Sequence, residues 1–206
     1  MQNQQPSTLK EIRVHGTQDF PCAFYQTGTR IKGNMVKHHW HEEVELLYFS
    51  GGEFCLEVNM ERFNISEECF YVINPGELHS ISVEKNGGCV ENAVVFHMDM
   101  LSSAYALDQI QTNLIQPVQN GSIQFPRCLR KNEPAFEPVR KSYEEIRNVF
   151  GGDSFRENYY DGEAVTDDIT RQLFIKSALL RILAVLSANN LFEVTEKNHD
   201  HRIETI

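Results

Sequence analysis

The feature that most constrains this chain is a succession of short, β-rich segments between residues 11 and 100, with no helix-forming stretch among them. Val, Ile, Phe and Tyr are frequent in these segments, and they are separated by turn-forming clusters at Thr27-Gly28, Ser50-Gly51-Gly52, Asn74-Pro75-Gly76 and Asn86-Gly87-Gly88. Strands at this spacing, without helices between them, are typical of a sandwich or a barrel. We therefore expect a mainly β domain with strands near Cys22–Gln26, Trp40–Phe49, Phe54–Val58, Phe63–Ile65, Cys69–Ile73, Ser80–Val83 and Ala93–Met98.

Beyond Met100 the apolar residues follow a helical period instead. A first helix is expected from Pro134 to Phe150, because an apolar stripe recurs there at the spacing of one helix face and Gly151-Gly152 gives a stop signal. The stripe consists of Phe136, Val139, Tyr143, Ile146 and Phe150.

A second helix is expected from Thr166 to about Asn190, with Asp167 and Asp168 in its first turn, where acidic side chains are favourable. From Leu173 to Leu186 the segment is apolar almost all round, and a helix of this kind must be covered on more than one side. The β domain or the first helix can cover one side. The other side is a candidate homodimer face.

The balance of charge argues against one class of function. The chain contains 19 Lys and Arg against 29 Asp and Glu, which gives a net charge of −10, the wrong sign for gripping a phosphate backbone. The stretch from Trp40 to Glu61 holds acids but no Lys or Arg, so the β domain should repel a duplex. Any contact with DNA must come from a part of the protein that this sequence does not contain.

No segment predicts a membrane span or a signal peptide. A span needs about 20 apolar residues, and the longest apolar run, from Ala178 to Leu186, is short and carries Arg181. The N-terminus lacks a basic region followed by an apolar one. The 5 cysteines are an odd number without a C-x-x-C pair, which indicates reduced thiols packed in the core of a cytoplasmic protein.

The segment around His39 carries the chemistry. If it is a regular strand, His39, His41 and Glu45 project from one face, because side chains alternate with period 2. A tight turn at Asn74-Pro75-Gly76 could bring His79 across from a neighbouring strand. Imidazoles with a carboxylate suit a divalent metal such as Zn, Ni, Fe or Mn, although the same side chains can also hold a polar ligand by hydrogen bonds alone.

The spacing of these residues carries a resemblance. The pattern Gly33-x5-His39-x-His41-x3-Glu45-x6-Gly52 matches the first cupin motif at every spaced position. The segment Asn74-Pro75-Gly76-Glu77-Leu78-His79 keeps the Gly-x-x-His of the second motif, but it lacks the usual upstream Gly and downstream Asn. This variant and the run from His39 to Tyr48 resemble the sensor domain of AraC-type transcription regulators. The tail Arg202-Ile203-Glu204-Thr205-Ile206 is similar to the first turns of their DNA-binding domain, which would make the chain a fragment of something longer.

The resemblance implies a cupin-like double-stranded β-barrel, or jelly roll, followed by two or more helices. It further implies a flexible N-terminus over residues 1–10, a barrel over 11–130, a helical dimerisation region over 131–192, and a linker with the start of a missing DNA-binding domain over 193–206. The barrel would bind a small polar effector, directly or through a metal, at His39, His41, Glu45 and His79. The helices would form a homodimer, and DNA would be bound only by the absent domain.

Two other functions use the same residues. A metal-dependent cupin enzyme, such as a dioxygenase or an isomerase, would bind its metal with the three histidines and the glutamate and keep open positions for substrate. A non-catalytic cupin would merely pair His39 with Glu45. The regulator domain, which predicts no turnover, is the interpretation that the variant second motif and the helical tail favour.

Overall fold

The computed structural model describes residues 9–29, 31–86, 89–105, 107–151, 163–164 and 168–195. The elements follow in the order β1 Cys22–Thr29, β2 Gly33–His39, β3 Val44–Phe49, β4 Phe54–Val58, β5 Glu61–Ile65, β6 Cys69–Ile73, β7 His79–Val83, β8 Cys89–Phe96, η2 Met98–Leu101, η3 Gln111–Ile115, α1 Gln116–Gln119, β9 Ile123–Gln124, β10 Cys128–Arg130, α2 Phe136–Val149, β11 Glu163–Ala164, α3 Ile169–Ala188 and β12 Glu193–Val194.

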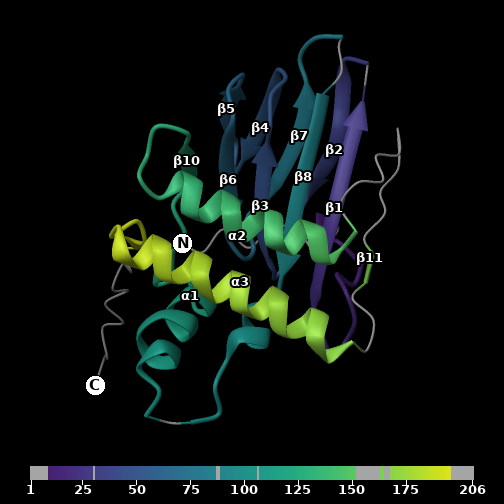
Figure 1. The fold of residues 1–206 in the computed structure, drawn as a ribbon. Coiled ribbons are helices and arrows are strands. Elements are labelled where there is room, and N and C mark those ends of the chain that lie inside the picture. The colour runs from purple at the N-terminus through teal and green to yellow at the C-terminus, as the bar shows by residue number, and fades with distance from the viewer. Residues whose placement is uncertain are drawn as a thin grey trace, which may run out of the picture.

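Two antiparallel sheets face each other and form the expected β domain (Figure 1). The larger sheet has the order β10-β6-β3-β8-β1-β11, and the smaller one has the order β2-β7-β4-β5. Side chains from both sheets fill the space between them with an apolar core that includes Leu47, Phe49, Leu56, Ile73 and Ile81. The prediction of a mainly antiparallel β-barrel is therefore confirmed.

Helices α2 and α3 pack together across the outer face of the larger sheet (Figure 1). They bury a second apolar core against that face, so the larger sheet is covered on both sides. The predicted stripe of the first helix lies entirely in this core, where Phe136, Val139, Tyr143, Ile146 and Phe150 are all buried. Helix α2 begins at Phe136 rather than Pro134 and is followed by Gly151 at a φ of 85°, a conformation that glycine adopts readily.

Helix α3 begins at Ile169, and Asp168 is its N-cap rather than a first-turn residue. The Asp168 carboxylate accepts hydrogen bonds from the backbone N–H groups of Thr170 at 2.8 Å and Arg171 at 3.3 Å. Thr166 and Asp167, where the helix was expected to start, lie outside the described residues. One side of α3 is buried through Ile175, Leu179, Ile182, Leu183 and Leu186.

The expected single strand from Trp40 to Phe49 is wrong. The chain forms β2 up to His39, bends between His41 and Glu43, and starts β3 at Val44. The bend is held by a hydrogen bond from the Gly76 N–H to the His41 carbonyl at 2.7 Å, a contact far away in the sequence. The expected turn at Thr27-Gly28 is also wrong, because both residues pair with β8 inside β1.

Both ends of the described part of the chain form backbone hydrogen bonds with segments far away in the sequence. The Trp40 N–H donates a backbone hydrogen bond to the Leu9 carbonyl at 3.0 Å, and the Glu11 N–H donates one to the Trp40 carbonyl at 2.9 Å. Leu9 and Glu11 lie on either side of residue 10, where we expected the flexible N-terminus to end. Strand β12, in the expected linker, pairs with β9. Residues 196–206, which include the tail that suggested a fragment, lie outside the described residues.

The described cysteines are mostly buried. Cys22, Cys55 and Cys69 are buried free thiols and Cys128 is half-buried, while the side chain of Cys89 is not described. Among the described residues, no helix combines the length and the hydrophobicity that crossing a membrane requires.

One acidic side chain lies in the apolar core between the sheets. Glu91 is 2% exposed and shares the inward face of β8 with Ala93 and Val95. Its cross-strand neighbour is Thr27, and neither Glu91 Oε1 nor Thr27 Oγ1 has a hydrogen-bond partner. Burial, with a smaller contribution from the charge of Glu45, raises the pKa of Glu91 well above its ordinary value of 4.5.

Glu91 should therefore make the protein less stable as the pH rises. Above pH 4.5 the carboxyl ionises in the unfolded chain but stays neutral in the folded one, so the free energy of unfolding falls until the folded-state pKa is reached. Glu91→Gln should flatten this fall by up to about 1.4 kcal/mol per pH unit. Urea unfolding of wild type and Glu91→Gln at pH 5, 6 and 7 measures this difference in the free energy of unfolding. Glu53→Gln, at a partly exposed position, is the control. Parallel curves of unfolding free energy against pH for wild type and Glu91→Gln would contradict the assignment.

Candidate functional site

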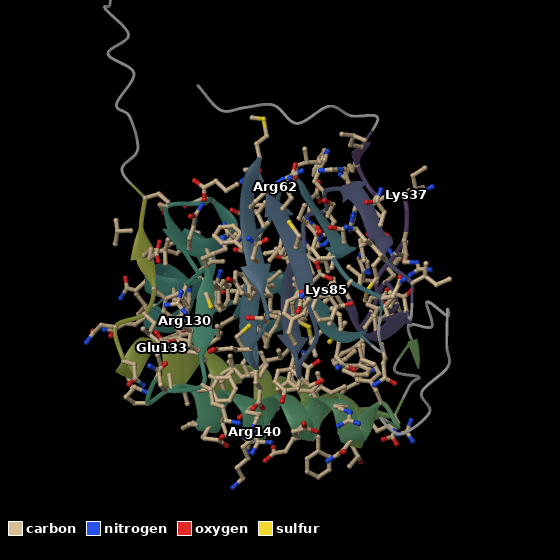
Figure 2. All side chains as sticks on the ribbon, turned by 90° about the horizontal axis from the view of Figure 1, so that it is seen from above. Lys37, Arg62, Lys85, Arg130, Glu133 and Arg140 are labelled. Carbon is tan, nitrogen blue, oxygen red and sulfur yellow. The ribbon has the colours of Figure 1, made fainter. Side chains whose placement is uncertain are left out.

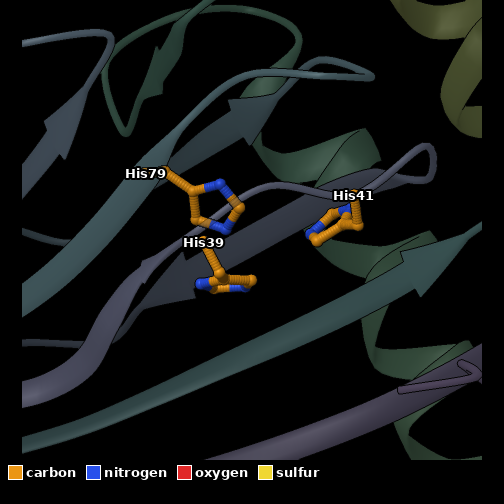
Figure 3. Close-up of side chains that lie close together, drawn as sticks. All are labelled: His39, His41 and His79. Carbon is orange, nitrogen blue, oxygen red and sulfur yellow. The ribbon is translucent and has the colours of Figure 1, made fainter. Parts of the chain in front are cut away.

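Three histidine rings gather at one end of the space between the sheets (Figure 3). His39 ends β2 and His79 begins β7, and the two residues are cross-strand partners. His41 follows in the bend before β3. The ring centroids of His39 and His79 are 4.2 Å apart, and those of His41 and His79 are 5.1 Å apart.

Each ring is oriented by the backbone close to it. The Nδ1 of His39 lies 2.8 Å from the carbonyl of Lys37, that of His41 lies 3.2 Å from the carbonyl of Glu43, and that of His79 lies 2.9 Å from the carbonyl of Glu77. Because a carbonyl can only accept a hydrogen bond, Nδ1 must carry the proton in all three rings. In the neutral form, each Nε2 therefore keeps its lone pair free.

Glu45, on β3 of the opposite sheet, directs its carboxylate at these rings. Its Oε2 lies 3.0 Å from His79 Nε2 and 3.7 Å from His41 Nε2. Both Glu45 Oε2 and His79 Nε2 are buried, and neither has a partner in hydrogen-bond geometry. Two acceptors so close together repel each other unless a proton or a metal cation lies between them.

This environment shifts the pKa values of Glu45 and His39. Burial opposes the charge of Glu45, but its contacts with His41 and His79, when these rings are protonated and donate from Nε2, outweigh burial and hold its pKa well below the ordinary value. Burial and the neighbouring charge of His79 lower the pKa of His39, which favours the neutral ring that a metal binds.

Two further residues, Glu11 and His15, reach the site from the N-terminal segment. Glu11 Oε2 lies 3.2 Å from His15 Nε2 and 3.5 Å from His39 Nε2. His15 is 4% exposed, and its ring centroid is 5.2 Å from that of His41. No sequence pattern marks either residue, because only the long-range pairing of this segment with Trp40 brings them to the histidines.

The turn that leads to His79 is held in place by contacts with the segment between β9 and β10. Glu77 forms an ion pair with Arg127, and its Oε2 also accepts a hydrogen bond from the Asn74 N–H at 2.7 Å. Arg127 donates to the Val72 carbonyl at 2.6 Å. The Phe125 N–H donates to Asn74 Oδ1 at 2.8 Å. These contacts fix the position from which His79 enters the site.

The four residues that the sequence singled out are thus close together, but for a different reason than the one predicted. His39, His41 and Glu45 do not share the face of one strand, because the chain bends between β2 and β3. The other histidines differ from them: His38 is largely exposed beside Glu57, and His97 caps η2 by accepting a hydrogen bond from the Asp99 N–H.

The donor set fits a divalent metal. One ligand atom from each of His39, His41 and His79 lies within 4.8 Å of the other two, and Glu45 adds a carboxylate. Tetrahedral ligands at about 2.1 Å from zinc lie about 3.4 Å apart, so the ligand atoms need to close in by up to about 1.4 Å. Glu11, His15 and His41 form a second group within the same limit.

The tautomers of the histidines can be measured. In metal-free protein above pH 7.5, long-range ¹H–¹⁵N spectra should show the Nδ1–H form for His39, His41 and His79, because each Nδ1 donates to a carbonyl. The exposed His38 should show the Nε2–H form that predominates in solution or a mixture of both forms. A majority Nε2–H form at two or more of the three clustered rings would contradict the geometry.

Comparisons with known proteins identify the family of this sequence. Residues 26–149 match the family model of the AraC-like ligand binding domain. An uncharacterised HTH-type transcriptional regulator of Bacillus subtilis, YdeC, is 28% identical over 114 residues, which are 52% of this chain and 39% of that protein. The match thus spans about two fifths of that relative.

Several of the solved structures with some similarity are described as cupin proteins. A predicted oxalate decarboxylase from Thermotoga maritima has 24% identity over 36% of this chain and 67% of that one, with a TM-score of 0.34. A cupin protein from Bacteroides fragilis has 14% identity over 42% of this chain and 75% of that one, with a TM-score of 0.36. Because the family model matches more than half of the sequence, this chain belongs to the family of AraC-like ligand binding domains.

Proposed function

We propose that this chain is the effector-sensing domain of an AraC-type transcription regulator and that its site holds a divalent metal. We infer the metal from two buried acceptors, Glu45 Oε2 and His79 Nε2, which lie 3.0 Å apart beside two more imidazoles. A cation between them removes their repulsion, and the family supplies the sensing role.

In this proposal His39, His41, His79 and Glu45 bind the metal, which could be Zn, Ni, Fe or Mn. Three imidazoles and one carboxylate leave coordination positions free, and the metal would supply Lewis acidity toward an oxygen-bearing effector there. Glu11 and His15 lie at the same end of the barrel. They would contact such an effector directly and select among effectors by charge and hydrogen bonding.

We further propose the division of the chain that the sequence indicated: a sensing barrel over residues 11–130 and a dimerisation region over 131–192. Helix α3 supports the second part, because Ile169, Leu173 and Leu180 form an exposed apolar stripe at helical spacing, while its inner side is buried. Such a stripe is suited to pack against a second copy around a two-fold axis. Contact with DNA belongs to a separate domain in this proposal.

Elemental analysis of protein purified without a histidine tag tests the metal. Wild type is expected to carry about one equivalent of metal, and His41→Ala or His79→Ala should weaken metal binding at least 10–100-fold. Removing a residue that only hydrogen-bonds to a metal ligand already lowers metal affinity by about this factor, and removing the ligand itself should lower it by no less. His38→Ala is the matched control, since that histidine is largely exposed outside the cluster. Equal metal content in all four proteins would refute the site.

The same samples separate a sensor from an enzyme. A metal-loaded sensor should be stabilised by small oxygen-donor molecules without consuming them, with a rise in Tm of about 5–10 °C at 100 times Kd. Metal-dependent oxygen uptake or turnover of the added molecule, lost in His41→Ala, would instead favour the cupin-enzyme alternative.

Sedimentation velocity tests the dimer. Leu180→Asp should give a folded monomer, because a carboxylate at a half-exposed position of α3 disrupts a homodimer but not the inner core. Met60→Asp is the control, because Met60 is an exposed apolar residue at the β4–β5 turn, away from α3. A wild type that is monomeric, or a Leu180→Asp variant that stays dimeric, would contradict the proposal.

A further inference from the structure

Two cysteines meet at the free edge of the larger sheet. Strand β10 is the edge strand and pairs only with β6, where Cys128 lies opposite Tyr71 and Arg130 opposite Cys69. All four residues line one shallow surface hollow of about 130 Å³. Cys128 is half-buried and opens onto this hollow, whereas Cys69 lies beneath the surface with 6% exposure.

The neighbours of Cys128 favour its thiolate. The Cys69 thiol and the Tyr71 hydroxyl donate hydrogen bonds to its sulfur, and the charge of Arg130 adds to them. The contact with Cys69 is the largest effect, and together these effects outweigh burial and the charge of Glu133, so that the pKa of Cys128 falls to about 7. Figure 2 shows Arg130 and Glu133 side by side at this edge; the Glu133 carboxylate accepts a hydrogen bond from the Arg130 N–H at 2.6 Å.

The other cysteines are in different surroundings. Cys22 is fully buried, and burial raises its pKa, so it stays a protonated core thiol. Cys55 is also buried. Of the four cysteines whose side chains the structure describes, only Cys128 is both accessible and held next to a second thiol.

We propose that Cys128 is an oxidation site for hydroperoxides and that Cys69 resolves the product to a Cys69–Cys128 disulfide. The Cys128 thiolate attacks one peroxide oxygen, the O–O bond breaks, and the leaving oxygen takes a proton and departs as water or an alcohol, which leaves a sulfenic acid. The Cys69 sulfur then attacks the Cys128 sulfur, the S–O bond breaks, and water leaves with the proton of Cys69. Two thiols and one hydroperoxide thus give one disulfide, one water and one further water or alcohol.

Closing the bond requires a small movement of β10. Cys69 and Cys128 are diagonal neighbours on antiparallel strands, whose Cα atoms lie about 7–8 Å apart, while disulfides span at most about 6.8 Å. A shift of about 1 Å is enough, and β10 is a three-residue edge strand with a single partner strand. Oxidation would therefore draw the edge of the larger sheet toward β6.

Peptide mapping of the whole chain tests the proposal, with the protein reduced, freed of metal and treated with one equivalent of hydrogen peroxide. The expected product is a Cys69–Cys128 cross-linked peptide. Cys69→Ser should instead stop at a sulfenic acid on Cys128 that dimedone traps, and Cys128→Ser should give neither product. Cys55→Ser is the matched control and should behave as wild type. Another pairing, or a wild type in which Cys128 stays a thiol or a lasting sulfenic acid, would overturn the proposal.

Alkylation kinetics supply a second measurement that does not depend on the disulfide. At pH 7 about half of Cys128 should be thiolate, against about 3% for an ordinary cysteine with a pKa of about 8.5. Iodoacetamide should therefore modify Cys128 roughly 10-fold faster in the folded protein than in urea, with a midpoint near pH 7. Tyr71→Phe should move this midpoint upward. A folded-state rate no higher than the rate in urea would refute an activated thiol.

Discussion

Each of the three clustered imidazoles donates its Nδ1 proton to a backbone carbonyl two residues away in the sequence. This interaction sets the tautomer and the tilt of the rings at the same time, and it leaves Nε2 lone pairs directed at one another and at Glu45. In a weakly polar interior such a group of acceptors is unfavourable unless positive charge joins it. The fold therefore supplies a repulsion that the proposed cation would remove.

The rest of the fold keeps this cluster away from bulk water. The larger sheet has one core toward the smaller sheet and another toward α2 and α3. Its central strands are consequently buried on both faces, which explains why β3 and β6 read as nearly continuous apolar runs rather than as an alternating pattern. The exception in β3 is Glu45, and its position coincides with the histidines on the opposite sheet.

Most of the architecture could be predicted from local patterns. The strand and turn signals gave a two-sheet β domain, and the stripe from Phe136 to Phe150 gave α2 with an error of two residues at its start. The spacing of the histidines and Glu45 singled out residues that the fold brings close together. Local patterns failed where long-range contacts decide: the bend at His41 depends on Gly76, and the strand pairing of Thr27-Gly28 with β8 overrides their turn propensity. Glu11 and His15 could not be found because no periodicity marks a segment that is held in place by Trp40.

The fastening of the His79 turn has a consequence for protein engineering. Asn74 and Glu77 are held by Phe125 and Arg127, which belong to the segment between β9 and β10, and Phe125 also contacts the ring of Phe192 beyond α3. Transplanting the histidines into another barrel would therefore not reproduce the geometry of the donors. A graft would have to include residues 125–127 and an apolar surface for Phe125, since part of the scaffolding of this pocket lies outside the strands that line it.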